Sequence, residues 1–194
     1  RRALGGRRWG ALDEVLVVAS AVSVQDVGDR PLDAQAQADQ QHAKFDDEKS
    51  EFSGYLNLWR WIHEARGGVP PPQPSPRGGG SERPSPPLGE GGGGGTPTHK
   101  LSNRQYEQLL RKNFINIRRV REWRDIHSQL LTVVTEHKWR INTQPASYEA
   151  LHKSMLAGLL GNIGWKMEDS DVYLGARGIK FYRHPGAHLK KRPG

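Results

Sequence analysis

Apolar residues recur at helical spacing along most of the chain, and the first run of them is the densest. Residues 12–24 are rich in Val, Leu and Ala. Asp13 and Glu14 fall in the first turn of this run, where a carboxylate interacts favourably with a helix N-terminus. Periodicity alone does not separate a strand from a helix in so apolar a segment, but its length and alanine content favour a buried helix.

Two further helices are expected before residue 66. The stretch 34–47 is rich in Ala and Gln, which are good helix formers, and Asp33 precedes it as an N-cap. Few of its positions are apolar, so we expect this helix on the surface. From Phe52 to Ile62 large apolar residues return at helical spacing, and Ser50 supplies the expected N-cap.

Beyond the middle of the chain the helical pattern resumes. Ser102 and Gln105 have the spacing of a capping box, which predicts the start of a helix. The next helix is expected from Arg118 to Lys138, with an apolar stripe of Val120, Trp123, Ile126, Leu130, Val133 and Val134.

A third helix of this part is expected over residues 148–163. Its predicted buried positions are Leu151, Met155, Leu156, Leu159, Leu160 and Ile163. Gly158 and Gly161 cost helix stability relative to alanine, which indicates that another backbone packs closely against them. After Trp165 the period changes, and residues 172–174 and 179–182 predict two short strands joined by a Gly-rich turn.

Residues 67–99 differ from the rest of the chain in composition. They consist almost entirely of Gly, Pro, Ser and Arg, and such a segment lacks the apolar side chains needed for a core. We interpret them as a disordered insert. A proline-rich ligand for an aromatic groove is the functional alternative.

The formal net charge of +8 is unevenly distributed along the 194 residues. Residues 1–66 carry 9 basic and 11 acidic side chains, whereas residues 100–194 carry 18 basic and 8 acidic ones, a net charge of +10. A basic half indicates a polyanionic partner, and nucleic acid is favoured over a membrane because no amphipathic basic helix stands free. A solvated basic surface without a partner is the alternative.

Two groups of basic residues are the candidate nucleic-acid contacts. The first, on the predicted helix 118–138, comprises Arg118, Arg119, Arg121 and Arg124. The second, on and after the last predicted strand, comprises Lys180, Arg183, Lys190 and Lys191. Phe181 or Tyr182 could stack on a base, as in single-strand binders. Alternatively, Glu122 and Asp125 pair with the arginines and leave a neutralised surface; the residues alone leave both interpretations open.

No catalytic or cofactor motif is present in the sequence. The glycine-rich run 89–95 lacks the lysine and the preceding strand of a phosphate-binding loop, and the acidic run 168–171 lacks the glycine and the downstream glutamate of a calcium loop. Without cysteine there is no disulfide, zinc-cysteine site or thiol chemistry, which fits a reducing, cytoplasmic compartment. We expect no catalytic residue, no metal and no cofactor in this chain.

The ends and the hydropathy of the chain add two expectations. No apolar run approaches the roughly 20 residues of a membrane span, so no membrane partner is expected. The first residues contain neither an initiator Met nor the apolar stretch of a signal peptide. We therefore expect the chain to begin within a longer protein.

Four stretches of the sequence resemble one known family, in that family's order. They are residues 14–26 with Arg30-Pro31, residues 52–59, residues 119–130, and residues 159–163 with 173–181 and 184–186. The chain resembles the region that follows the motor lobes in DEAH-box RNA helicases, most closely those of the bacterial HrpA type. Together the four stretches span nearly the whole chain outside the insert.

The resemblance implies a mainly α fold. Residues 1–66 and 100–166 would form a helical ratchet, or helicase-associated, domain that the insert 67–99 interrupts, and residues 167–194 would begin an OB-like barrel. In that family the ratchet and barrel lie against the motor lobes and help form a channel for single-stranded RNA. ATP and Mg bind in the motor lobes, to which nothing in this chain corresponds.

Two functional hypotheses follow. The first is an accessory RNA-channel region of an ATP-dependent DEAH-box RNA helicase, inactive alone, whose partners are single-stranded RNA and the motor lobes of its own parent chain. By position, Arg119, Arg121 and Arg124 match the family's arginine-bearing helix, and Lys180 and Arg183 match the first barrel strands. The second hypothesis is a protein-interaction scaffold with a disordered recruiting loop. Salt-dependent binding of single-stranded RNA discriminates between them.

Overall fold

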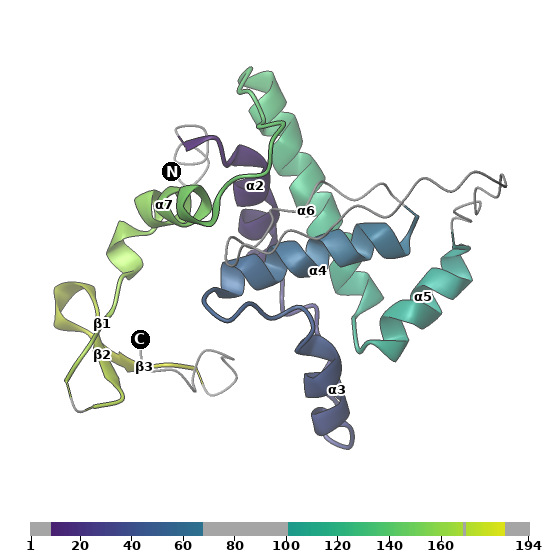
Figure 1. Ribbon diagram of the computed structural model, residues 1–194, viewed down its shortest axis with the longest axis horizontal. Coiled ribbons are helices and arrows are strands. Elements are labelled where there is room, and N and C mark those ends of the chain that lie inside the picture. The colour runs from purple at the N-terminus through teal and green to yellow at the C-terminus, as the bar shows by residue number, and fades with distance from the viewer. Residues whose placement is uncertain (1–8, 68–100, 169, 185–194) are drawn as a thin grey trace, which may run out of the picture.

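The computed structural model of the 194-residue chain describes residues 9–67, 101–168 and 170–184, and it is mainly helical there (Figure 1). The helices are α2 (Leu12–Ala21), α3 (Gln35–His42), α4 (Glu51–Ala65), α5 (Asn103–Lys112), α6 (Ile117–Glu136) and α7 (Tyr148–Gly158). A small sheet follows, built from β1 (Trp165–Lys166), β2 (Val172–Leu174) and β3 (Lys180–Tyr182). The predicted fold class, helices followed by a short β segment, is confirmed. Residues 68–99 of the predicted insert, and Lys190 and Lys191, lie outside the described residues.

Helix α2 lies at the centre of the helical part and packs against α4, α6 and α7. Most of its side chains are buried, as expected of a helix that is apolar on nearly all faces. One core forms between α2, α4, α5 and α6 around Trp123, Ile62 and Leu110. The prediction of a buried helix in residues 12–24 is confirmed.

Two of the predicted helix starts are confirmed in detail. The Ser50 side chain accepts a hydrogen bond from the backbone N of Ser53 (3.3 Å) at the start of α4. At the start of α5, Ser102 accepts from the backbone N of Gln105 (3.2 Å), and the Gln105 side chain accepts from the backbone N of Ser102 (2.9 Å). Both bonds of a capping box are therefore present.

Helix α3 is shorter than predicted. It begins at Gln35 after Ala34, with no side-chain cap, so the assignment of Asp33 as N-cap is wrong. It ends at His42, because the chain leaves the helix to bury Phe45 against Trp61 of α4, with ring centroids 5.2 Å apart. The gain from burying this aromatic side chain outweighs the helix propensity of the following residues.

The last helix also ends earlier than predicted. Helix α7 stops at Gly158, and a 3-10 turn over Leu160–Asn162 follows. Leu151 and Met155 are buried as expected, but the predicted core positions Leu156, Leu160 and Ile163 are exposed. A Cβ on Gly161 would meet no atom within 4 Å, so the prediction of close backbone packing there is wrong.

The strands form an antiparallel sheet in the order β1-β2-β3. The predicted hairpin is confirmed, with Val172 opposite Tyr182 and Leu174 opposite Lys180. Its turn contains Arg177 (φ 60°) and Gly178 (φ 74°), both in the left-handed region. Strand β1 was not predicted, because two residues are too few to show an alternating pattern.

Candidate nucleic-acid interface

Helix α6 carries the four arginines of the first candidate group, and Asn116 fixes its start. The Asn116 side-chain oxygen accepts hydrogen bonds from the backbone N of Arg118 (3.0 Å) and of Arg119 (3.3 Å). Its amide donates to the carboxylate of Asp29 (3.1 Å), which ties the helix N-terminus to the loop after α2. The first turn of α6 is thereby held in place.

Trp123 fixes the rotation of α6 about its own axis. Its side chain is 0% exposed, and its indole Nε1 donates to the carbonyl oxygen of Val17 and to Ser20 Oγ of α2, both at 3.1 Å. The ring also contacts Trp59 of α4, with centroids 4.8 Å apart. Since the indole is held on the inner face, the direction of every other side chain on α6 follows from helix geometry.

The four arginines do not form one stripe. Arg118 and Arg121 are exposed and lie about 60° apart around the helix, on the side away from the core. Arg119 and Arg124 are half-buried and lie roughly 140° apart, on opposite flanks of the buried face. The guanidinium of Arg119 donates to the backbone carbonyl of Asp26, which ties α6 to the loop after α2. Arg118 and Arg121 are therefore the exposed members of this group, whereas Arg119 and Arg124 keep only part of their surface accessible.

The alternative of a self-neutralised arginine surface predicts ion pairs with Glu122 and Asp125. In the described part of the chain the ion pairs join Arg30 to Asp39, Arg111 to Glu107, and Lys153 to Glu149. None of them involves an arginine of α6, although Glu122 and Asp125 stand one turn after Arg118 and Arg121. The charges of Arg118 and Arg121 thus remain available to a polyanion.

The second candidate group lies on the small sheet, apart from α6 (Figure 1). Lys180 is exposed on β3, and the guanidinium of Arg183 lies over the ring of Tyr173, 5.7 Å from its centroid. The rings of Tyr173 and Phe181 stack at 5.7 Å. Tyr182 is 71% exposed, so it is better placed than Phe181 to stack on a base.

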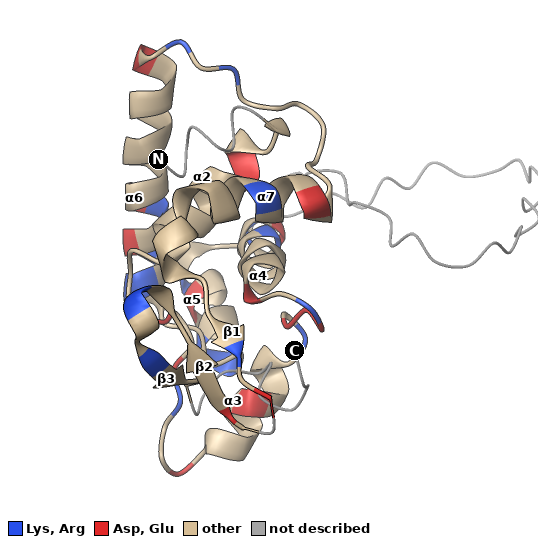
Figure 2. Ribbon diagram, turned by 90° about the vertical axis from the view of Figure 1, so that its left-hand side faces the viewer, with Lys and Arg blue, Asp and Glu red and all other residues tan. Residues whose placement is uncertain are grey.

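In Figure 2 the ribbon is blue, marking Lys and Arg positions, both on α6 and on the strands. The structure therefore places the two candidate groups on two separate surfaces.

A further basic group was not predicted from the sequence. Arg66 at the end of α4 and Arg124 of α6 both lower the pKa of His63, although burial is the larger cause of that shift. The same two arginines act on Tyr106 of α5, whose pKa is raised overall by burial. The sequence marks Arg124 but gives no signal that it shares neighbours with Arg66, because residues 67–99 separate Arg66 from the helices that it meets.

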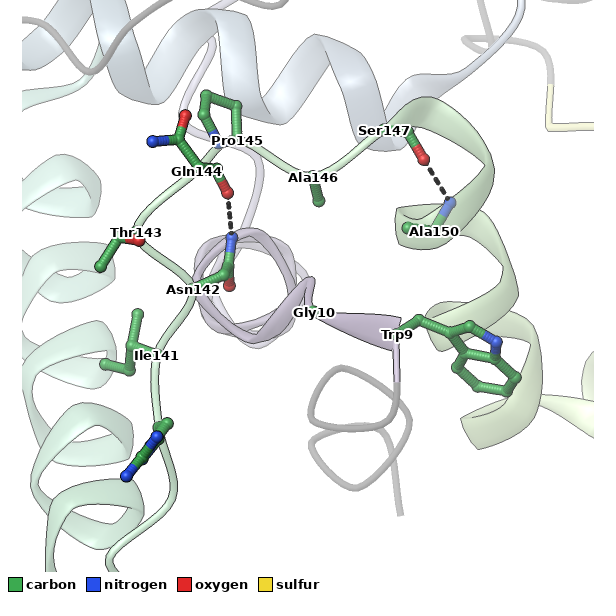
Figure 3. Close-up of a pocket in the computed structure, with 11 residues that line it drawn as sticks. Trp9, Gly10, Ile141, Asn142, Thr143, Gln144, Pro145, Ala146, Ser147 and Ala150 are labelled. Carbon is green, nitrogen blue, oxygen red and sulfur yellow. Dashed lines mark hydrogen bonds between the residues drawn. The ribbon is translucent and has the colours of Figure 1, made fainter.

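An open hollow lies between the loop after α6 and the start of α7 (Figure 3). It is lined by Trp9, Gly10, Arg140, Ile141, Asn142, Thr143, Gln144, Pro145, Ala146, Ser147 and Ala150. The side chain of Asn142 accepts from the backbone N of Asp13 (2.9 Å) and donates to Glu14 (2.9 Å) and to the carbonyl of Gln144 (2.9 Å). Asn142 therefore acts as a cap for α2 supplied from a distant loop, and Arg140 is the only charged side chain in the lining.

Two negative findings apply to the described residues alone. They contain no group of three or more His, Asp or Glu side chains that could hold a metal ion. Of the helices described, none is both long enough and apolar enough to cross a membrane.

Two bacterial proteins are similar to the chain over all or nearly all of its length. No family profile matches it. Over 193 residues, 100% of its length, it is 33% identical to the ATP-dependent RNA helicase HrpA of Escherichia coli (strain K12). Over 191 residues, 98% of its length, it is 32% identical to the ATP-dependent RNA helicase HrpA homolog of Haemophilus influenzae. In both cases the chain spans only 12% of the relative's length. Because the identity extends over the entire chain, the protein belongs to the HrpA-type helicases and corresponds to one segment of them.

Proposed function

We propose that this chain is an accessory RNA-contacting region of an ATP-dependent RNA helicase, and that it lines part of the channel for single-stranded RNA. The relatives named above are RNA helicases, which supports RNA as the polyanion. The observation that carries the proposal is the exposed pair Arg118 and Arg121. Both project from a helix whose rotation is fixed by Trp123, and neither forms an ion pair in the described structure.

In this function the two arginines contact successive phosphates of the strand. A guanidinium suits that role because it stays charged and makes two parallel hydrogen bonds to phosphate oxygens. Each phosphate neutralised on a single strand changes the slope of log affinity against log salt by about 0.7. Loss of both contacts should therefore lower the slope by about 1.4. Tyr182, with Lys180 beside it on β3, would contribute base stacking at the separate surface of the sheet.

Binding of a fluorescein-labelled oligouridylate to the 194-residue chain, measured by anisotropy over a salt series, tests the proposal. We expect Arg118→Glu/Arg121→Glu to weaken binding by about tenfold or more, since two surface ionic contacts contribute about 0.7 kcal/mol each and reversal adds repulsion. Arg104→Glu/Arg111→Glu on α5 is the matched control, with the same change in net charge. Equal losses in the two double variants would mean that only net charge matters, and the proposed contact would be wrong.

The remaining parts of the proposal concern the parent protein. ATP and Mg would bind in motor lobes elsewhere in the longer helicase, so we propose that this chain alone does not hydrolyse ATP, and that its parent acts in the cytoplasm. The motor lobes would be its protein partner. Exposed apolar side chains around the sheet, among them Trp165 and Ile179, support a further contact of this kind. The alternative scaffold function depends on residues 67–99, which apart from Gly67 lie outside the described structure.

A further inference from the structure

Three helices bring the further basic group, Arg66 and Arg124, together with titratable side chains on one side of the bundle. Helix α4 contributes His63 and, directly after its end, Arg66; helix α6 contributes Arg124 and His127. Tyr106 comes from α5, which packs against α6. We call these five residues the His63 cluster. Figure 1 shows how α5 and the start of α6 lie next to the end of α4.

Arg66 is held in place by neutral groups. Its guanidinium lies over the ring of Tyr106, 5.2 Å from the centroid, and one of its nitrogens donates to the side-chain oxygen of Asn103 (3.1 Å). Neither contact carries a negative charge. Within the described residues no carboxylate forms an ion pair with Arg66 or with Arg124. Neither half-buried guanidinium is therefore offset by a carboxylate in direct contact with it.

The two arginines face the same neighbours. Arg124 and Arg66 each oppose the protonation of His63, and each also acts on the hydroxyl of Tyr106. Arg66 follows His63 by three residues and Arg124 precedes His127 by three residues, about one helical turn in each case, and both imidazoles pack against the indole of Trp59. The two positive charges thus lie near the same pair of imidazoles, and no ion pair in the described structure offsets them, which favours an anion nearby.

The backbone of α4 orients the imidazole ring of His63. Its Nδ1 lies 2.8 Å from the carbonyl oxygen of Trp59, and since a carbonyl only accepts, Nδ1 is the protonated nitrogen. Nε2 is then the atom that can take up a second proton. The ring packs against Trp59 at 4.5 Å, and His127 packs against the same indole at 4.7 Å. This aromatic contact restricts the rotation of both imidazoles.

His127 has an unsatisfied polar atom. Its Nε2 is buried and has no hydrogen-bond partner. Burial lowers the pKa of His127, and the charge of His63 lowers it further. An imidazole nitrogen without a partner is costly in a folded protein. If His63 takes up a proton from the solvent as an anion binds, the electrostatic potential at His127 Nε2 changes as well.

We propose that the His63 cluster is a binding site for a single phosphate group, held between Arg66 and Arg124, with His63 taking up a proton as the anion binds. Arg supplies forked donors, and protonated His63 supplies a third. The site uses Arg66 and His63, which are outside the sequence-predicted candidates. If the phosphate belongs to an RNA strand, the site is part of the function proposed above, and this identification of the ligand rests on that function. The existence of the anion site does not rest on it.

Proton uptake follows from the arrangement of charge. Burial, partly offset by the hydrogen bond to the Trp59 carbonyl, and then Arg124 and Arg66 keep the pKa of His63 below its ordinary value of 6.5. An anion near the arginines offsets their positive field, so binding raises the pKa of His63. By linkage, the anion then binds more tightly as the pH falls from 7.5 to 5.5.

Two-dimensional NMR of the histidine ring protons in the 194-residue chain tests this. Sulfate serves as the probe because its charge is constant from pH 5.5 to 7.5, and sodium chloride at equal ionic strength is the control. We expect sulfate, but not chloride, to raise the His63 pKa. Arg66→Gln or Arg124→Gln should weaken the affinity for sulfate, read from the His63 ring protons, by about tenfold or more. Arg111→Gln, at an exposed site on α5, should leave it unchanged.

Substitution of the histidine separates binding from protonation. His63→Gln should keep sulfate binding at pH 7.5, followed through the ring protons of His127, but should abolish its increase toward pH 5.5. An unshifted His63, or equal effects of Arg66→Gln and Arg111→Gln, would overturn the site.

An oligouridylate then identifies the source of the phosphate. A rise of the His63 pKa with the oligonucleotide supports an RNA phosphate. A response to sulfate alone overturns the RNA link while the anion site stands. The test of Arg118 and Arg121 uses other residues, so failure of the proposed function is distinguishable from failure of this site.

Discussion

The buried, hydrogen-bonded indole of Trp123 is expected to contribute strongly to the unfolding free energy of this fold. Trp123→Phe keeps an aromatic ring but removes the Nε1–H donor and two ring carbons. Two buried carbon groups contribute about 1.6 kcal/mol at about 0.8 kcal/mol each. The lost hydrogen bond adds about 1 kcal/mol. This second contribution stays small because the single hydroxyl proton of Ser20 is shared between the carbonyl oxygens of Leu16 (2.7 Å) and Val17 (2.9 Å), so the Val17 oxygen can still accept from Ser20. The expected loss of unfolding free energy is therefore about 2.5 kcal/mol.

Urea unfolding followed by far-ultraviolet circular dichroism measures this loss without relying on tryptophan fluorescence, which six tryptophans would complicate. Trp165→Phe is the matched control, because Trp165 is 78% exposed and the same chemical change there should cost no more than about 0.5 kcal/mol. If the two variants lost equal stability, the account of Trp123 as the residue that fixes α6 would be refuted.

Three further predictions concern the loop clamp, the sheet and one histidine. Asn142→Ala should lower the unfolding free energy by about 1–3 kcal/mol in urea titrations, because the backbone N of Asp13 in α2 and the carbonyl oxygen of Gln144 each lose a hydrogen bond to Asn142. A Cβ on Gly164 would overlap the ring of Phe181, whereas one on Gly161 meets open space, so Gly164→Ala should lower the thermal midpoint and Gly161→Ala should not. Burial, followed by the charge of His63, holds the pKa of His127 below 6.5, so its contribution to stability is present above pH 6.5 and is lost on acidification; His127→Leu should reduce the fall in urea midpoint between pH 7.5 and 5.5.

The sequence determined the elements whose signals are local. The capping box of Ser102 and Gln105 and the N-cap Ser50 depend on hydrogen bonds between residues three apart, so the sequence specifies them directly. The apolar run that became α2 was recognisable because its composition alone requires burial. The relationship to HrpA-type helicases was likewise predictable, since it lies in the order of residues rather than in their contacts.

Tertiary structure decided where helices end and which arginines are accessible. Helix α3 stops early because a distant helix offers Phe45 a buried site, and no local pattern encodes that competition. The arginines of α6 looked equivalent in sequence, yet the contacts of Trp123 with α2 rotate the helix so that two are exposed and Arg119 becomes a tie to a loop. Arg66 meets Tyr106 across 39 intervening positions, most of them in a segment with no helical pattern. Contacts between residues so far apart in the sequence depend on the packing free energy of the whole core. The His63 cluster is therefore visible only in the folded chain.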